Sequence, residues 1–179
     1  MLPTYSYMLA SKLNAMFRYQ DDLIVFEDKW VNGYAFSDNI RNIYPPEMEL
    51  KSTNLTQNTS TYLDLRCSVY QGKYLYRSYD KRNDFPFDVI NYPYKNSNIP
   101  TNPAYGVFTS QLVRLSRINY TANDFQKDVV KLVKKFVKQG FDSRKLREKY
   151  LTYCTNYLSE WGRYGVDISS HEFMTKLFV

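Results

Sequence analysis

Near its N-terminus the chain carries the stretch Phe17-Arg18-Tyr19-Gln20-Asp21-Asp22-Leu23-Ile24-Val25-Phe26. Apolar residues stand on both sides of the polar triplet Gln20-Asp21-Asp22, and the second apolar run is rich in β-branched and aromatic side chains. Two short apolar runs separated by turn-prone polar residues are typical of a β-hairpin. The sequence therefore predicts a hairpin that presents two adjacent carboxylates at its tip.

Two neighbouring carboxylates concentrate negative charge, and like charges this close resist joint ionisation unless a cation neutralises them. Mg²⁺ is suited to that role because it binds hard oxygen ligands and leaves room for substrate phosphates. In two-metal phosphoryl transfer, such carboxylates place the ions that activate a hydroxyl and stabilise the leaving group. The alternative is an Asp-Asp pair in a solvated turn with no function, and the dipeptide alone does not decide between them.

A second hairpin is predicted further along the chain. Residues 62–70 alternate in character, with Leu63, Leu65, Cys67 and Val69 expected on one face. Gln71-Gly72 supplies turn residues, and residues 73–79 form the return strand.

The remaining segments predict a change from strands to helices. Short helices are expected at residues 5–16 and 36–43, and a strand at 48–51. The Pro- and Asn-rich stretch 85–103 is expected to be irregular and to separate two regions. Three helices should follow. The first carries Val107, Leu112 and Leu115, and the second runs over Phe125–Phe136 and is closed by Gly140. The third is expected over residues 144–158, with Asp142 or Ser143 as its cap. Beyond Trp161 the pattern gives no firm signal.

The predicted fold class is therefore α+β, with antiparallel hairpins followed by an all-helical region. The expected division is residues 1–84 for the strand-containing part, 85–103 for the connection and 104–179 for the helices.

Composition limits the classes of partner and compartment. The 179 residues include 24 Lys and Arg against 18 Asp and Glu, a formal charge of +6, and this balance favours nucleic acid as a partner. The 18 tyrosines suit base stacking, although a biased coding genome explains them equally well. Two cysteines and one histidine show no zinc-ligand spacing, and they indicate a reducing, intracellular compartment, nuclear or cytoplasmic. No secretion signal and no membrane span are expected.

The stretch Tyr19-Gln20-Asp21-Asp22 resembles motif C of reverse transcriptases, the Tyr-x-Asp-Asp hairpin of the polymerase palm. Later segments follow the order of that family: Ile43–Lys51 stands where motif D belongs, the hairpin 62–82 resembles motif E, the primer grip, and the helices stand where the thumb belongs. Residues 96–118 and Lys138-Gln139-Gly140-Phe141 are similar to the corresponding region of Penelope-like retroelement enzymes. The resemblance covers about residues 17–150.

The resemblance implies roles for individual residues. Asp21 would be the principal ligand of Mg²⁺ or Mn²⁺ and Asp22 an auxiliary one. Tyr19 would lie near the primer terminus and Gln20 near the nucleotide pocket. Lys51 would protonate the leaving pyrophosphate, whereas a solvated lysine without function is the alternative.

The same resemblance implies that basic side chains hold the phosphate backbone of a primer or duplex. Arg114 and Arg117 stand three residues apart and so share a helix face. Lys131, Lys134 and Lys138 form part of a basic stripe on the next helix, which in isolation also fits an ordinary solvated face. The residues expected to contact the backbone are Arg77, Lys81, Arg82, Arg114, Arg117, Lys131, Lys134 and Lys138.

By family, the expected partners are an RNA template, a DNA primer and, in a complete enzyme, a deoxynucleoside triphosphate. The metal-binding Asp of motif A, the glycine signature of motif B and the fingers are missing from these residues. We therefore expect the chain alone to bind nucleic acid weakly and not to extend a primer. A polymerase half on another segment would complete it. Two other functions stay open: a non-catalytic basic module that binds nucleic acid, and a Tyr-rich surface that binds protein.

Overall fold

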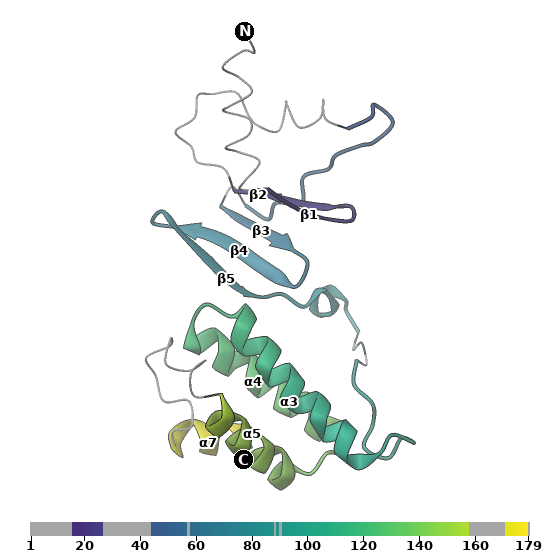
Figure 1. Ribbon diagram of the computed structural model, residues 1–179, viewed down its shortest axis with the longest axis vertical. Helices are drawn as coiled ribbons and strands as arrows, with labels where there is room; N and C mark the ends of the chain where they lie inside the picture. Colours follow the sequence, from purple (N-terminus) through teal and green to yellow (C-terminus); the bar gives the residue numbers. More distant parts are fainter. Residues whose placement is uncertain are drawn as a thin grey trace. The chain divides into compact units, whose positions relative to one another are not determined.

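The computed structural model is an α+β fold, as the sequence predicts, built from short antiparallel strands and, within the described residues, four α-helices (Figure 1). It describes residues 16–26, 44–56, 58–87, 89, 91–157 and 171–178. The chain divides into two compact units, residues 1–63 and 64–179. Each unit is described by itself below.

The first unit contains the predicted carboxylate hairpin. β1 (Met16–Tyr19) pairs antiparallel with β2 (Asp22–Val25), with Tyr19 opposite Asp22 and Phe17 opposite Ile24. Ile24 is buried, and the Phe17 and Phe26 rings pack edge to face with their centroids 6.2 Å apart. The turn is one residue shorter than predicted, because Asp22 already belongs to β2. β3 (Thr59–Tyr62) follows later in this unit.

Two other predictions for this unit have different outcomes. The strand expected at residues 48–51 is wrong, since no strand forms there and the Met48 N–H instead donates to the Pro45 carbonyl at 2.9 Å, which closes a turn. The helix expected at residues 36–43 lies outside the described residues. So does the helix expected at 5–16, except for Met16, which begins β1.

The second unit begins with the second predicted hairpin. β4 (Leu65–Tyr70) pairs antiparallel with β5 (Lys73–Ser78). Gln71 and Gly72 have φ values of 49° and 72°, which match the type I′ turn that two-residue hairpins favour. The continuous strand expected over residues 62–70 is wrong, because Leu63 has φ of 52° and lies with Asp64 in a turn before β4.

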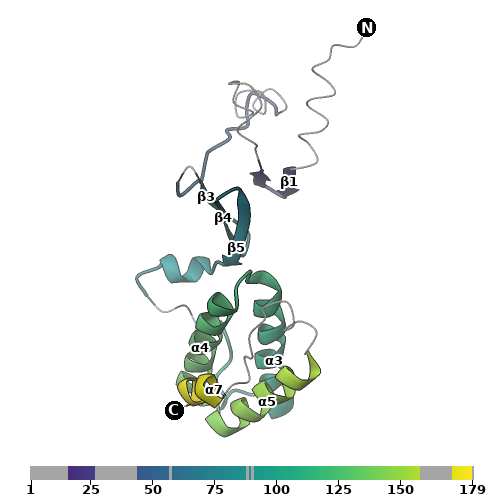
Figure 2. The same cartoon turned by 90° about the vertical axis from the view of Figure 1, so that its left-hand side faces the viewer.

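Helices form the core of the second unit. α3 (Thr101–Ile118), α4 (Ala122–Lys138) and α5 (Ser143–Asn156) match the three predicted helices. α3 begins earlier than expected, because Pro103 lies in its first turn, where a missing N–H removes no helical hydrogen bond. α7 (His171–Phe178) was not predicted; it packs against α4 and α5 (Figure 2).

Local signals at the helix ends explain these boundaries. The Thr121 hydroxyl accepts from the Asp124 N–H at 3.1 Å and caps α4. The Asp142 carboxylate accepts from the Arg144 N–H at 2.8 Å and caps α5, so Asp142 and not Ser143 is the cap of the two that the sequence allows. Gly140 follows the end of α4 with φ of 85°, a conformation that glycine adopts without strain.

Aromatic side chains fill the space between the helices. Phe136 is fully buried, and its ring centroid lies 4.8 Å from those of Tyr92 and Phe141. The Tyr153 hydroxyl, also buried, donates to the Leu112 carbonyl at 3.3 Å. No helix in the described part of the chain is both long and apolar enough to cross a membrane.

Candidate functional site

The tip of the β1–β2 hairpin presents its carboxylates to solvent. Asp21 and Asp22 are both exposed, as is Tyr19 at 56%. Gln20 has φ of 53°, and its carbonyl accepts a hydrogen bond from Arg18 Nε at 2.9 Å, which fixes the turn. The donor set, the hard oxygens of two solvent-exposed carboxylates, fits Mg²⁺ or Mn²⁺. Within the described ranges, no three His, Cys, Asp or Glu side chains gather as a metal-binding group.

Lys51 is the other side chain of the first unit for which a catalytic role was expected. Its ammonium pairs with Glu49 at 3.2 Å, and both side chains are about three-quarters exposed. An exposed pair of this kind contributes about 0–1 kcal/mol to stability, so it does not fix the lysine in one place.

A polar junction joins the β4–β5 hairpin to the helices of the second unit. Asn119, fully buried at the end of α3, accepts from the Ser78 N–H at 3.0 Å and donates to Asp128 at 3.1 Å. The Ser78 hydroxyl also donates to Asp128. The next residue, Tyr120, donates its N–H to the Tyr76 carbonyl at 2.9 Å. The last residues of β5 are therefore bonded to the connection between α3 and α4.

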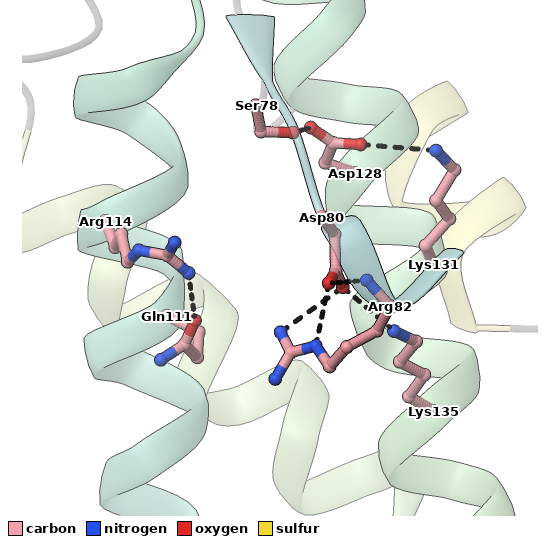
Figure 3. A network of polar contacts seen from close by, with 8 residues as sticks. All are labelled: Ser78, Asp80, Arg82, Gln111, Arg114, Asp128, Lys131 and Lys135. Carbon is pink, nitrogen blue, oxygen red and sulfur yellow. Dashed lines mark hydrogen bonds and ion pairs between the residues drawn. The ribbon is translucent and has the colours of Figure 1, made fainter. Parts of the chain in front are cut away.

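Ion pairs surround this junction (Figure 3). Asp80 lies between two cations, 2.7 Å from Arg82 Nε and 3.5 Å from Lys135 Nζ. Asp128 lies 3.4 Å from Lys131 Nζ. Arg114 lies 2.5 Å from Asp64 and also donates to Gln111 at 3.3 Å.

These side chains line an open pocket of about 110 Å³ between β5, the segment after it, α3 and α4. Its polar walls carry both signs of charge, and each carboxylate that lines it has at least one cationic partner. The charged and amide residues in the lining are Asp64, Asp80, Arg82, Asn83, Gln111, Arg114, Asp128, Lys131 and Lys135.

The environment of Asp80 changes its acidity. Partial burial opposes ionisation of the Asp80 carboxyl, but hydrogen bonds from the Arg82 side chain and backbone, together with the charges of Arg82 and Lys135, outweigh it and lower its pKa. Asp80 also caps the 3₁₀ helix η2 (Lys81–Asp84) by accepting from the Arg82 N–H at 3.1 Å. The carboxylate is thus part of the structure in its charged form.

An acid-dependent loss of stability follows from that lowered pKa. The stabilisation by Asp80 is present above its ordinary value of 3.8 and is lost as the pH falls through the lower folded-state pKa. We expect Asp80→Asn to lower the free energy of unfolding by about 1–2 kcal/mol at pH 7. This difference should shrink as the pH falls below 3.8 and through the folded-state pKa of Asp80. Urea denaturation of both proteins from pH 7 to pH 2 measures this. If the difference in free energy of unfolding between the two proteins is the same at pH 7 and pH 2, the Asp80 carboxylate does not stabilise the fold in its charged form.

The residues predicted to contact a nucleic-acid phosphate backbone fall into two groups in the structure. Arg82, Arg114 and Lys131 are held in ion pairs at the junction and would have to exchange a carboxylate for a phosphate. The exposed group consists of Arg77, Lys81, Arg117, Lys134 and Lys138.

Sequence reasoning did not single out Ser78, Asp80, Asn119, Asp128 or Lys135. Each has an ordinary local setting in the sequence, and only the fold brings them together. The one signal available was the end of α3, where an Asn stands just past the last apolar residue, as C-terminal cap residues often do.

Comparison with known proteins assigns neither a family nor a function. No family model matches the chain, and no match was found among curated proteins or solved structures.

Proposed function

We propose that the chain is the part of a reverse transcriptase that carries the catalytic carboxylate hairpin, the primer-holding hairpin and the thumb. The observation that carries the proposal is the β1–β2 hairpin, which has Asp21 and Asp22 exposed at its tip. A second hairpin and a helical bundle follow it in the chain order of that family.

In this proposal Mg²⁺ or Mn²⁺ supplies the charge that activates a primer 3′-hydroxyl and stabilises the leaving pyrophosphate. Asp21 and Asp22 would hold the metal, and both carboxylates are exposed, so that substrate phosphates can approach them. Tyr19, on the strand opposite Asp22, contributes an exposed ring near the same end of the hairpin.

The second unit holds the RNA–DNA duplex in this proposal. Its exposed cations, Arg77 on β5 and Arg117, Lys134 and Lys138 on α3 and α4, suit phosphate groups. Contacts of this kind position a duplex without reading its sequence. In this proposal the hydrogen bonds of the buried Asn119 side chain keep β5 and α4 in place while the second unit holds the nucleic-acid backbone.

A second candidate function is a non-catalytic module that binds nucleic acid through these cations alone. The exposed cations of the second unit favour it, because they require nothing from the carboxylate hairpin. Under this function, removing the charges of Asp21 and Asp22 leaves duplex binding unchanged or strengthens it.

Metal binding separates the two functions. We expect Mg²⁺ at millimolar concentration to shift the amide resonances of residues 19–23 in an NMR titration of the whole chain. Asp21→Asn and Asp22→Asn should each weaken this binding about tenfold, because each removes a charged oxygen ligand. Glu47→Gln, which removes an exposed carboxylate outside the hairpin, is the matched control and should leave the affinity unchanged.

Either of two results would overturn the catalytic proposal. One is the absence of Mg²⁺-induced shifts at the hairpin tip; the other is a double variant that binds Mg²⁺ as tightly as the original chain. The purified chain alone should not extend a DNA primer on an RNA template, so Mg²⁺-dependent synthesis by it would contradict the expectation that further polymerase segments are needed.

A further inference from the structure

Two arginines face each other across the β4–β5 hairpin. Arg66 and Arg77 are direct cross-strand partners in the antiparallel register. Side chains at such positions share one face of the sheet, with Cβ atoms about 5 Å apart. Like charges at this separation destabilise a hairpin. An anion bound between the two guanidinium groups would remove this repulsion.

Neither guanidinium forms an ion pair with a carboxylate among the residues that the structure describes. Arg66 Nε is buried and has no hydrogen-bond acceptor among these residues. The Arg66 guanidinium lies over the Tyr79 ring, 5.4 Å from its centroid, which restricts where it points. A buried donor without an acceptor is costly, and an anion bound to the same guanidinium would offset part of that cost by neutralising its charge.

An open pocket adjoins this pair. Its volume is about 250 Å³, and Arg66 and Arg77 line it together with Lys127 and Lys131 of α4. A single water needs only about 10–15 Å³ by the same kind of measure, so a compact anion with its hydration fits. Strand and helix thus bring four cationic side chains to one cavity.

Carboxylates also line this pocket, but they are engaged elsewhere. Asp128 accepts from Ser78 and Asn119, and Asp124 accepts from the Thr121 hydroxyl at 2.7 Å. Asp84 accepts from the Tyr79 hydroxyl.

Asp80, the remaining carboxylate of the lining, pairs with Arg82 and Lys135. Each acidic side chain of the pocket therefore has a partner other than Arg66 and Arg77.

We propose that Arg66, Arg77 and Lys127 form a binding site for a compact tetrahedral oxyanion, a phosphate group. Arg66 and Arg77 supply guanidinium groups from opposite strands, and Lys127 supplies a charge from α4. The site uses none of the residues of the carboxylate hairpin and does not depend on metal binding there. The phosphate is either a free ion or a phosphodiester of a nucleic acid.

Thermal unfolding of the whole chain tests the site with inorganic phosphate as the probe. Phosphate should raise the unfolding midpoint more than chloride at equal ionic strength, because a ligand that binds only the folded state stabilises it. Arg66→Gln and Arg77→Gln should each weaken phosphate affinity about tenfold, since each removes charge-assisted hydrogen bonds. Arg147→Gln, on the exposed side of α5, is the control and should respond as the original chain does.

The variants also separate binding from folding. In chloride, Arg77→Gln should be at least as stable as the original chain because it removes a repulsive pair. Arg77→Lys, which keeps the charge, should retain part of the phosphate response. Equal effects of phosphate and chloride on the original chain would overturn the site, as would an undiminished phosphate response in both Gln variants.

A competition titration identifies the source of the phosphate. If a short RNA–DNA duplex competes with inorganic phosphate for the shifts of the Arg66 NMR resonances, the natural ligand is a phosphodiester. If the duplex and inorganic phosphate bind independently, the ligand is a free anion. Both results support the oxyanion site, and they remain interpretable if the Mg²⁺ titration of the hairpin tip fails.

Discussion

Replacing Asn119 with Ala is expected to lower the free energy of unfolding by about 2–4 kcal/mol. The Asn119 side chain is fully buried, accepts from the Ser78 N–H and donates to Asp128 and to the Leu115 carbonyl. Alanine leaves the Ser78 N–H without this acceptor and removes a donor from Asp128. Unsatisfied buried groups account for most of the expected cost.

Hydrogen exchange locates the effect of this substitution. The Ser78 amide should be protected in the original chain and exchange much faster in Asn119→Ala, because β5 loses its bond to the α3–α4 connection. Asn123→Ala changes the same residue type at an exposed position of α4 and serves as the matched control. If the free energy of unfolding of Asn119→Ala lies within 0.5 kcal/mol of the original value, a margin typical of surface substitutions, the Asn119 hydrogen bonds do not hold the junction together.

Elements with a strong local signal were predictable from the sequence. Gln71-Gly72 between alternating residues identifies the β4–β5 hairpin because only a few residue types accept positive φ at a two-residue turn. The apolar spacing of Phe125, Val129 and Phe136 identifies α4, and all three side chains are buried. Asp142 and Gly140 mark helix ends through their own backbone preferences.

Elements that depend on tertiary context were not predictable. The alternation over residues 62–70 continues through Leu63 and Asp64, yet the chain turns there, since Leu63 adopts a left-handed conformation that its sequence does not favour. α7 buries Phe173, Met174 and Leu177 against the core, a spacing that is compatible with a helix but too short to stand out.

The junction shows why a candidate site is harder to predict than a fold. Ser78 and Asp128 lie 50 positions apart in the chain, and Ser78 and Asn119 lie 41 apart. No local pattern links them. The sequence identified Arg82 and Arg114 as cations available to phosphate, but not the carboxylates of Asp80 and Asp64 that hold them.

Binding of an RNA–DNA duplex to the second unit should depend strongly on salt. If about five exposed cations each neutralise a phosphate, the logarithm of the binding constant should fall by about 4–5 per tenfold rise in salt. Between 50 and 200 mM salt, affinity should therefore fall by about 10²–10³-fold. Arg117→Gln should reduce this slope by about 1, because it removes one phosphate contact. Lys149→Gln, an exposed cation of α5 outside the predicted contacts, should leave the slope unchanged.

Fluorescence anisotropy of a labelled RNA–DNA duplex, titrated with the whole chain at several KCl concentrations, measures this slope. The proposal that the second unit holds a nucleic-acid backbone predicts binding with a steep linear dependence on salt, which becomes shallower in Arg117→Gln and not in Lys149→Gln. Absence of binding at 50 mM KCl, or binding that hardly changes up to 200 mM, would contradict it and would favour a tyrosine-rich surface that binds protein instead.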